Sequence, residues 1–88
     1  GAKYWFVRSY GASNTSEFIA TYVEDIYSNG GHNVVGLLQS QHKKKVALAL
    51  GALADHGFLG NEQEREETLG RIYHHAGLGK EAIKMLTQ

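Results

Sequence analysis

Apolar residues recur at helical spacing in the first half of the chain, between two clear boundary signals. Asn14 can cap a helix N-terminus, and Glu17 stands three residues later, as in a reciprocal capping box. The run Asn29-Gly30-Gly31 follows the apolar residues and can supply the left-handed conformation that ends a helix. We therefore predict a helix over residues 14–30. Its apolar stripe comprises Phe18, Ile19, Tyr22, Val23 and Ile26.

The same pattern recurs later in the chain, because Asn61 stands 47 residues after Asn14 and Gly77 stands 47 residues after Gly30. Glu64 again follows the capping residue by three positions. We therefore predict a second helix over residues 61–77, whose acidic first turns suit the positive end of the helix dipole. The acidic residues are Glu62, Glu64, Glu66 and Glu67, and the apolar stripe comprises Leu69, Ile72, Tyr73 and Ala76.

Four further segments have the composition and the positions of strands. Lys3–Tyr10 reads KYWFVRSY, which is rich in aromatic residues and has apolar side chains on both faces of a strand. An apolar segment follows each predicted helix, at Val34–Leu38 and at Ala82–Leu86. The segment Val46–Leu50 alternates Val-Ala-Leu-Ala-Leu with a period of two. The order strand, helix, strand therefore occurs twice.

This order predicts an α+β fold of the ferredoxin-like type, a split βαβ sandwich with βαββαβ topology. We expect four antiparallel strands with two helices on one face of the sheet, in a single domain that spans residues 1–88. The domain would consist of two pseudo-repeated βαβ halves, at about residues 3–40 and 43–88.

Two of the predicted strands also have the composition of helices, which leaves alternatives open. Residues 43–56 are rich in Ala, Leu and Lys and have apolar residues at helical spacing before Gly57. Residues 80–88 have a similar helical propensity. An α+β fold with a helical C-terminal half and an entirely helical fold are therefore the alternatives to the ferredoxin-like sandwich.

The C-terminal part of the chain also resembles a helical repeat. Leu69-Gly70, Tyr73 and Gly77, followed by Ala82-Ile83, fit the pattern LG-x-x-Y-x-x-x-G-x-x-x-x-AI. This pattern is similar to the middle of a tetratricopeptide or pentatricopeptide repeat, over about 20 residues. The resemblance implies a fragment of a helical-repeat scaffold. Such arrays need about three repeats for stability, and a chain of this length holds two at most.

Composition and charge exclude several classes of function. Nine basic and nine acidic side chains give a net charge of zero, which argues against a general nucleic-acid binder and against adhesion to anionic membranes. Because the chain has no cysteine, a disulfide scaffold and a Cys-ligated metal site are excluded. The longest uncharged apolar run, Val46–Ala54, is shorter than the roughly 20 residues that span a bilayer. We therefore expect a protein partner, no nucleic acid and no membrane span.

The histidines are candidates for chemistry. His74 and His75 are adjacent on a predicted helix, so their side chains diverge by about 100° and cannot both bind one metal ion. A charged imidazole at the end of a helix offsets the helix dipole, and we keep both as candidate binding residues. Asp55-His56 has the residue types of a general base with its carboxylate, but sequence neighbours seldom adopt that geometry. We therefore predict no catalytic residue, no metal ligand and no cofactor.

The aromatic residues Tyr4, Trp5, Phe6 and Tyr10 are the strongest candidates for a binding surface. One layer of helices covers only one face of a small sheet, so a strand that is apolar on both sides leaves hydrophobic area exposed. We predict a small non-enzymatic binding or assembly module, whose open aromatic sheet face pairs with a second copy or with another protein.

Two other functions remain open. The first is a small dimeric α+β barrel protein that binds a ligand or acts as an enzyme. The second is a secreted, precursor-processed, toxin-like subunit, which is suggested by a first residue other than Met and by five histidines that charge at acidic pH.

Overall fold

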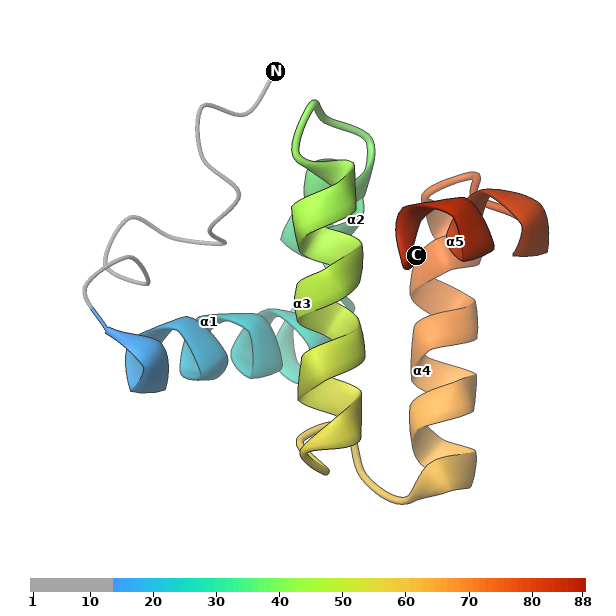
Figure 1. Cartoon of the computed structure of the whole chain (residues 1–88). Helices are drawn as coiled ribbons and strands as arrows, with labels where there is room; N and C mark the ends of the chain where they lie inside the picture. Colours follow the sequence, from blue (N-terminus) through green and yellow to red (C-terminus); the bar gives the residue numbers. More distant parts are fainter. Residues whose placement is uncertain (1–13) are drawn as a thin grey trace.

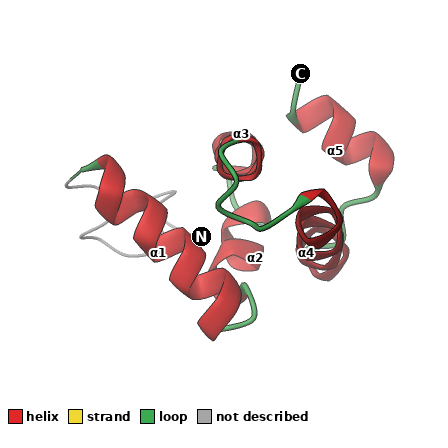
Figure 2. Cartoon of the chain, turned by 90° about the horizontal axis from the view of Figure 1, so that it is seen from below, coloured by secondary structure: helices red, strands yellow, loops and turns green. Residues whose placement is uncertain are grey.

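The computed structural model describes residues 14–88, which form five α-helices and no strand. Figure 1 shows α3 and α4 running in opposite directions, with α1 extending from the left to behind the middle of α3, and α2 also behind α3. Seen from below, α2 lies between α1 and α4 (Figure 2). The helices are α1 (Thr15–Ser28), α2 (His32–Leu38), α3 (Lys43–Asp55), α4 (Glu62–His75) and α5 (Lys80–Leu86).

The short helix α2 is the centre of the packing, because it contacts α1, α3 and α4. A helix of seven residues is marginal by itself, so its stability must come from the neighbours that bury it. Its three buried residues, Val34, Leu37 and Leu38, face the common core. The other core residues are Tyr22, Ile26, Val46, Ala47, Leu50, Leu53, Ala54, Leu59, Ile72, Tyr73 and Ala76.

Asp25, in the third turn of α1, supplies the N-terminal cap that α2 lacks. Gly31 occupies the N-cap position of α2 and has no side chain with which to accept a hydrogen bond. The Asp25 carboxylate accepts instead from the backbone N–H groups of Asn33 at 3.2 Å and Val34 at 2.9 Å. It also accepts from the side-chain amides of Asn29 at 3.0 Å and Asn33 at 2.9 Å. Asp25 is only 2% exposed, so this buried carboxylate ties α1 to α2.

Burial changes the pKa of two tyrosine side chains. Burial, followed by the charge of the nearby Asp25 carboxylate, raises the pKa of Tyr22. Burial alone raises the pKa of Tyr73. Both phenols therefore remain neutral at physiological pH and act as core side chains.

The two predicted helices with capping signals are confirmed. Asn14 accepts a hydrogen bond from the backbone of Glu17 at 2.9 Å, and α1 begins at the next residue. Asn61 and Glu64 form the full reciprocal capping box at the start of α4. The acidic first turn and the C-terminal histidines of α4 both suit its dipole. The local end signals were sufficient for these two elements.

The ferredoxin-like α+β sandwich is wrong for the described part of the chain. The predicted strands Val34–Leu38, Val46–Leu50 and Ala82–Leu86 lie in α2, α3 and α5 respectively. In α3 the buried residues are Val46, Ala47, Leu50, Leu53 and Ala54, which follow helical and not alternating spacing. The predicted first strand, Lys3–Tyr10, lies outside the described residues.

The helical alternative was correct for residues 43–56 and 80–88, and the turn at Gly77 separates α4 from α5. The packing is different from a simple helical pair, because α5 packs mainly against α3, which precedes α4 in the sequence.

A matched pair of glycine substitutions tests the turn between α1 and α2. Gly31 has φ +77°, and a Cβ added there would lie 3.2 Å from Cγ1 of Ile72. We expect Gly31→Ala to lower the free energy of unfolding by about 1–2 kcal/mol. Gly36 lies within α2 with open space around it, so Gly36→Ala should raise it by about 0.5–1 kcal/mol. Urea unfolding followed by far-UV circular dichroism measures both, and effects of the same sign would contradict the described turn.

Candidate apolar pocket between α1 and α3

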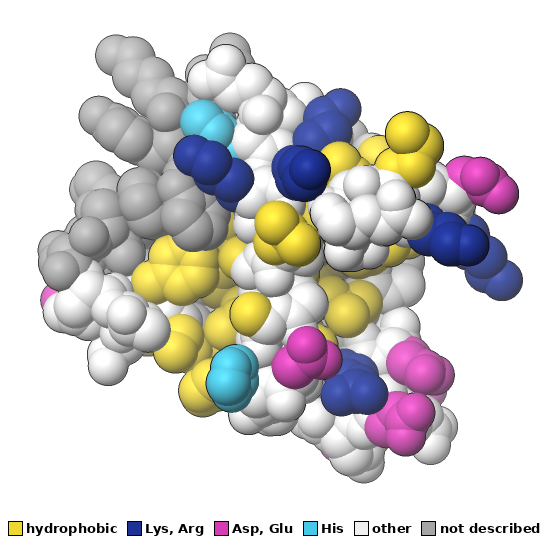
Figure 3. All heavy atoms as spheres, in the orientation of Figure 1, with side chains coloured by type: hydrophobic (Ala, Val, Ile, Leu, Met, Phe, Trp, Pro, Cys, Tyr) yellow, Lys and Arg dark blue, Asp and Glu magenta, His cyan; other side chains and the backbone are white. Residues whose placement is uncertain are grey.

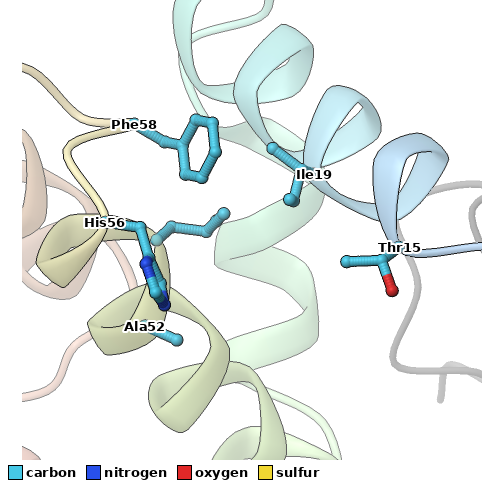
Figure 4. Close-up of a pocket in the computed structure, with 6 residues that line it drawn as sticks. Thr15, Ile19, Ala52, His56 and Phe58 are labelled. Atoms are coloured by element: carbon cyan, nitrogen blue, oxygen red, sulfur yellow. The ribbon is translucent and has the colours of Figure 1, made fainter.

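An open pocket of about 370 Å³ lies where α1 approaches the C-terminal end of α3. In Figure 4, Phe58 and Ile19 approach each other from opposite sides, with Ala52 and His56 along the α3 side. Its volume falls within the range of about 300–1,000 Å³ that is usual for ligand sites in proteins. The residues that line it are Thr15, Ile19, Ala52, Leu53, His56 and Phe58.

The first wall of the pocket comes from the N-terminal half of α1. Thr15 and Ile19 are four residues apart, so they lie on the same face of the helix, one turn from each other. The Asn14 cap fixes the first turn, because its side chain accepts the backbone N–H of Glu17. This wall is therefore held by a regular, capped helix.

The second wall comes from the end of α3 and the turn that follows it. Ala52 and His56 again share a face at a spacing of four residues. Gly57, at φ +83°, adopts the left-handed conformation that allows the chain to reverse. The backbone N–H of Phe58 then donates to the carbonyl of Leu53 at 2.9 Å, which closes a Schellman motif. This motif returns the Phe58 ring to the same site as Leu53.

The chemistry of the pocket is apolar with two polar groups. Ile19, Ala52, Leu53 and Phe58 provide the walls, and Phe58 remains 43% exposed. Among the described lining residues, only the Thr15 hydroxyl and the His56 imidazole can form side-chain hydrogen bonds. Such a site can bury an apolar or aromatic group and donate or accept one or two hydrogen bonds at its rim.

The charged side chains lie away from the centre of this pocket. Figure 3 shows hydrophobic side chains along the junction of α1 and α3, with basic groups mainly above and acidic groups mainly below. The antiparallel arrangement of α3 and α4 explains this separation, because each helix begins with a charged run. The basic run is Lys43, Lys44 and Lys45, and the acidic run is Glu62, Glu64, Glu66 and Glu67.

Of the predicted site residues, only His74 and His75 are among the described residues, and neither lines the pocket. His74 and His75 are exposed in the last turn of α4, with ring centroids 6.0 Å apart and ring planes perpendicular. Tyr4, Trp5, Phe6 and Tyr10 lie outside the described residues, and the described part contains no sheet that could offer an open face. Among residues 14–88, no group of three or more His, Asp or Glu side chains is arranged to hold a metal ion.

Most of the lining residues were not predicted as site residues from the sequence. His56 was a candidate only as a general base beside Asp55, and Ile19 was predicted to lie in the apolar stripe of a helix. The signal that could have found the second wall is Gly57, because a glycine helix stop followed by Phe58 and preceded by Leu53 has the residue types of a Schellman motif.

The comparisons with known proteins give no relative from which a function could be inferred. No family model, no curated protein and no solved structure matches the chain. Within the described helices, none is both long and apolar enough to cross a bilayer.

Proposed function

We propose that this chain is a small non-enzymatic association module, which binds a polypeptide by receiving one of its aromatic or aliphatic side chains in the α1/α3 pocket. The observation that carries the proposal is the open apolar pocket, where the large hydrophobic side chain of Phe58 is partly exposed to water. Concave apolar sites with a few polar groups at their edge are common binding sites in proteins. Grooves between helices commonly receive a few apolar anchor residues of a partner.

The construction of the pocket supports a role in recognition. Its walls are the Asn14-capped α1 and the end of α3, which the Gly57 turn closes. A site on regular helices loses little conformational entropy when it binds, so more of the interaction energy is available for affinity. His56 at the rim gives a hydrogen-bonding group that can orient the bound side chain.

A small apolar ligand is the second candidate occupant, and the pocket volume of about 370 Å³ favours it. The two candidates differ in what surrounds the bound ring. A polypeptide presents an amide backbone next to the side chain, whereas a small ligand does not. Comparing N-acetyl-tryptophanamide with 3-methylindole therefore separates them, because a polypeptide site should prefer the compound with the amides.

An NMR titration with N-acetyl-tryptophanamide tests the proposed function. We expect amide shifts that saturate at millimolar probe and are largest at Thr15, Ile19 and Ala52. Ala52→Arg fills the exposed rim of the pocket. In a chain that also carries Trp5→Ala/Phe6→Ala, so that its own aromatic side chains cannot compete, Ala52→Arg should weaken binding about tenfold, which corresponds to the loss of roughly 1.4 kcal/mol.

The matched control is Leu48→Arg, which places the same charge on an exposed position of α3 that does not line the pocket. This variant should bind the probe as the wild type does. Equal weakening by both arginines, or shifts distributed away from α1 and α3, would contradict the proposal.

A further inference from the structure

We infer that the polypeptide bound in the α1/α3 pocket is this chain's own aromatic segment, Tyr4–Val7, acting within the same molecule. This inference rests on the proposed function, because it names the occupant of the same pocket. It assigns a role to Tyr4, Trp5 and Phe6, and it makes the segment a built-in competitor for any other ligand of the site.

The place where the segment joins the described structure supports this occupant. Thr15, the first residue of α1, itself lines the pocket, and Trp5 is ten residues before it. Ten residues of extended chain span up to about 33–36 Å. The tether is therefore long enough to return to the pocket and short enough to keep the segment beside it.

The chemistry of the segment is complementary to the pocket. Four consecutive apolar residues, Tyr-Trp-Phe-Val, could bury against Ile19, Leu53 and Phe58. An aromatic ring beside Phe58 gains the attraction of stacked or edge-to-face pairs. The phenol of tyrosine and the indole N–H of tryptophan need a hydrogen-bond partner when they are buried. The His56 imidazole is placed at the rim to provide one.

Charge complementarity points in the same direction. Lys3 and Arg8 flank the apolar residues of the segment. Asp55 stands exposed beside His56 at the end of α3. Lys3 or Arg8 near this carboxylate would add a weak, salt-dependent attraction, although the net charge of the whole chain is zero.

The short tether favours docking of the segment within the same molecule over docking onto a second copy. A short flexible connection gives an effective concentration of about millimolar for the tethered group. At micromolar chain concentration, the segment of the same molecule therefore outcompetes the segment of any other copy. The expected species in dilute solution is a monomer whose pocket is occupied.

Trp5 is the only tryptophan of the chain, so its fluorescence reports the position of the segment directly. In the wild-type chain at micromolar concentration, we expect blue-shifted emission and protection from acrylamide. Ala52→Arg should shift the emission to the red and raise quenching to the level of free N-acetyl-tryptophanamide. Leu48→Arg should change neither quantity. A wild-type Trp5 that is as quenchable as the free compound would overturn the inference.

Two further measurements complete the test. Light scattering on a sizing column should give a monomer for the wild-type chain, and a dimer that protects Trp5 would overturn docking within one molecule. The double variant Trp5→Ala/Phe6→Ala, checked for helix content by circular dichroism, should bind N-acetyl-tryptophanamide about tenfold more tightly than the wild type, because its pocket is no longer occupied.

The double variant also separates this inference from the proposed function. If wild type and double variant bind the probe equally, the pocket binds side chains but the aromatic segment does not occupy it. If neither binds the probe, the proposed function fails, and the inference fails with it.

Discussion

Asp25→Ala is expected to lower the free energy of unfolding by about 3–5 kcal/mol, as is typical when one member of a buried charged network is removed. The carboxylate accepts hydrogen bonds from two backbone N–H groups of α2 and from two amide side chains. Its loss would leave these donors without their acceptor in a region where Asp25 itself is nearly inaccessible to water. A domain of this size has a total stability of about 4–13 kcal/mol, so the variant is expected to be partly unfolded at 37 °C.

Urea unfolding of the Asp25 variants measures this effect. Asp25→Asn keeps the shape and one acceptor oxygen, so it should cost less than Asp25→Ala. Asp55→Ala is the matched control, because Asp55 is an exposed aspartate at the end of α3 and should change stability by less than about 0.5 kcal/mol. If Asp25→Ala and Asp55→Ala have equal effects, Asp25 does not hold α1 and α2 together.

Leu50→Ala is expected to lower the free energy of unfolding by about 2–5 kcal/mol, whereas Leu48→Ala should lower it by less than about 0.5 kcal/mol. Leu50 is fully buried and Leu48 is 46% exposed, although they are two residues apart on α3. In a strand, residues two apart lie on the same face and would have similar burial. The pair therefore tests the helix directly, by chemical denaturation of two variants with the same change in side-chain volume.

Similar losses of unfolding free energy in Leu48→Ala and Leu50→Ala would contradict the helix and favour the alternating strand. A large cost at Leu48 with a small cost at Leu50 would place the opposite face of α3 in the core. Only the predicted inequality agrees with burial of Val46, Leu50 and Leu53 on one side of the helix.

The sequence was informative where a helix has its own end signals. Asn14 with Glu17, and Asn61 with Glu64, are local hydrogen-bonding patterns, so they were readable without knowledge of the rest of the chain. The segment 46–50 was ambiguous, because Val-Ala-Leu-Ala-Leu fits a period of two and its larger residues also fit helical spacing. Counting further along the chain to Leu53 and to Gly57 resolves this ambiguity in favour of a helix.

The short helices α2 and α5 were not predictable in the same way. Each has only seven residues, and its apolar residues form a run that a buried strand would also have. A tertiary contact stabilises α2 as a helix. Asp25 of α1 caps it by accepting from the backbone N–H groups of Asn33 and Val34, which are eight and nine residues further along the chain. Asp25 lies three residues after Tyr22, at the edge of the apolar face of α1, and nothing in its sequence neighbourhood indicates that it caps another helix.

The candidate pocket could be predicted only in part for a related reason. Each wall follows a local rule, the spacing of four residues in α1 and the glycine turn after α3. The two walls lie close together because of the way α1 crosses α3, and the packing of both helices against α2 sets this crossing. The residues Ile19 and Ala52 are 33 positions apart, and nothing in their neighbourhoods indicates that they share a site.

The central claim is that the α1/α3 pocket binds an aromatic side chain of a polypeptide. The most direct test is a measurement of nuclear Overhauser effects between N-acetyl-tryptophanamide and the Trp5→Ala/Phe6→Ala chain. We predict contacts from the indole ring protons to the methyl groups of Ile19, Ala52 and Leu53, and their loss in the background of Ala52→Arg. Contacts to other methyl groups, or none at a probe concentration that shifts the amides, would contradict the account.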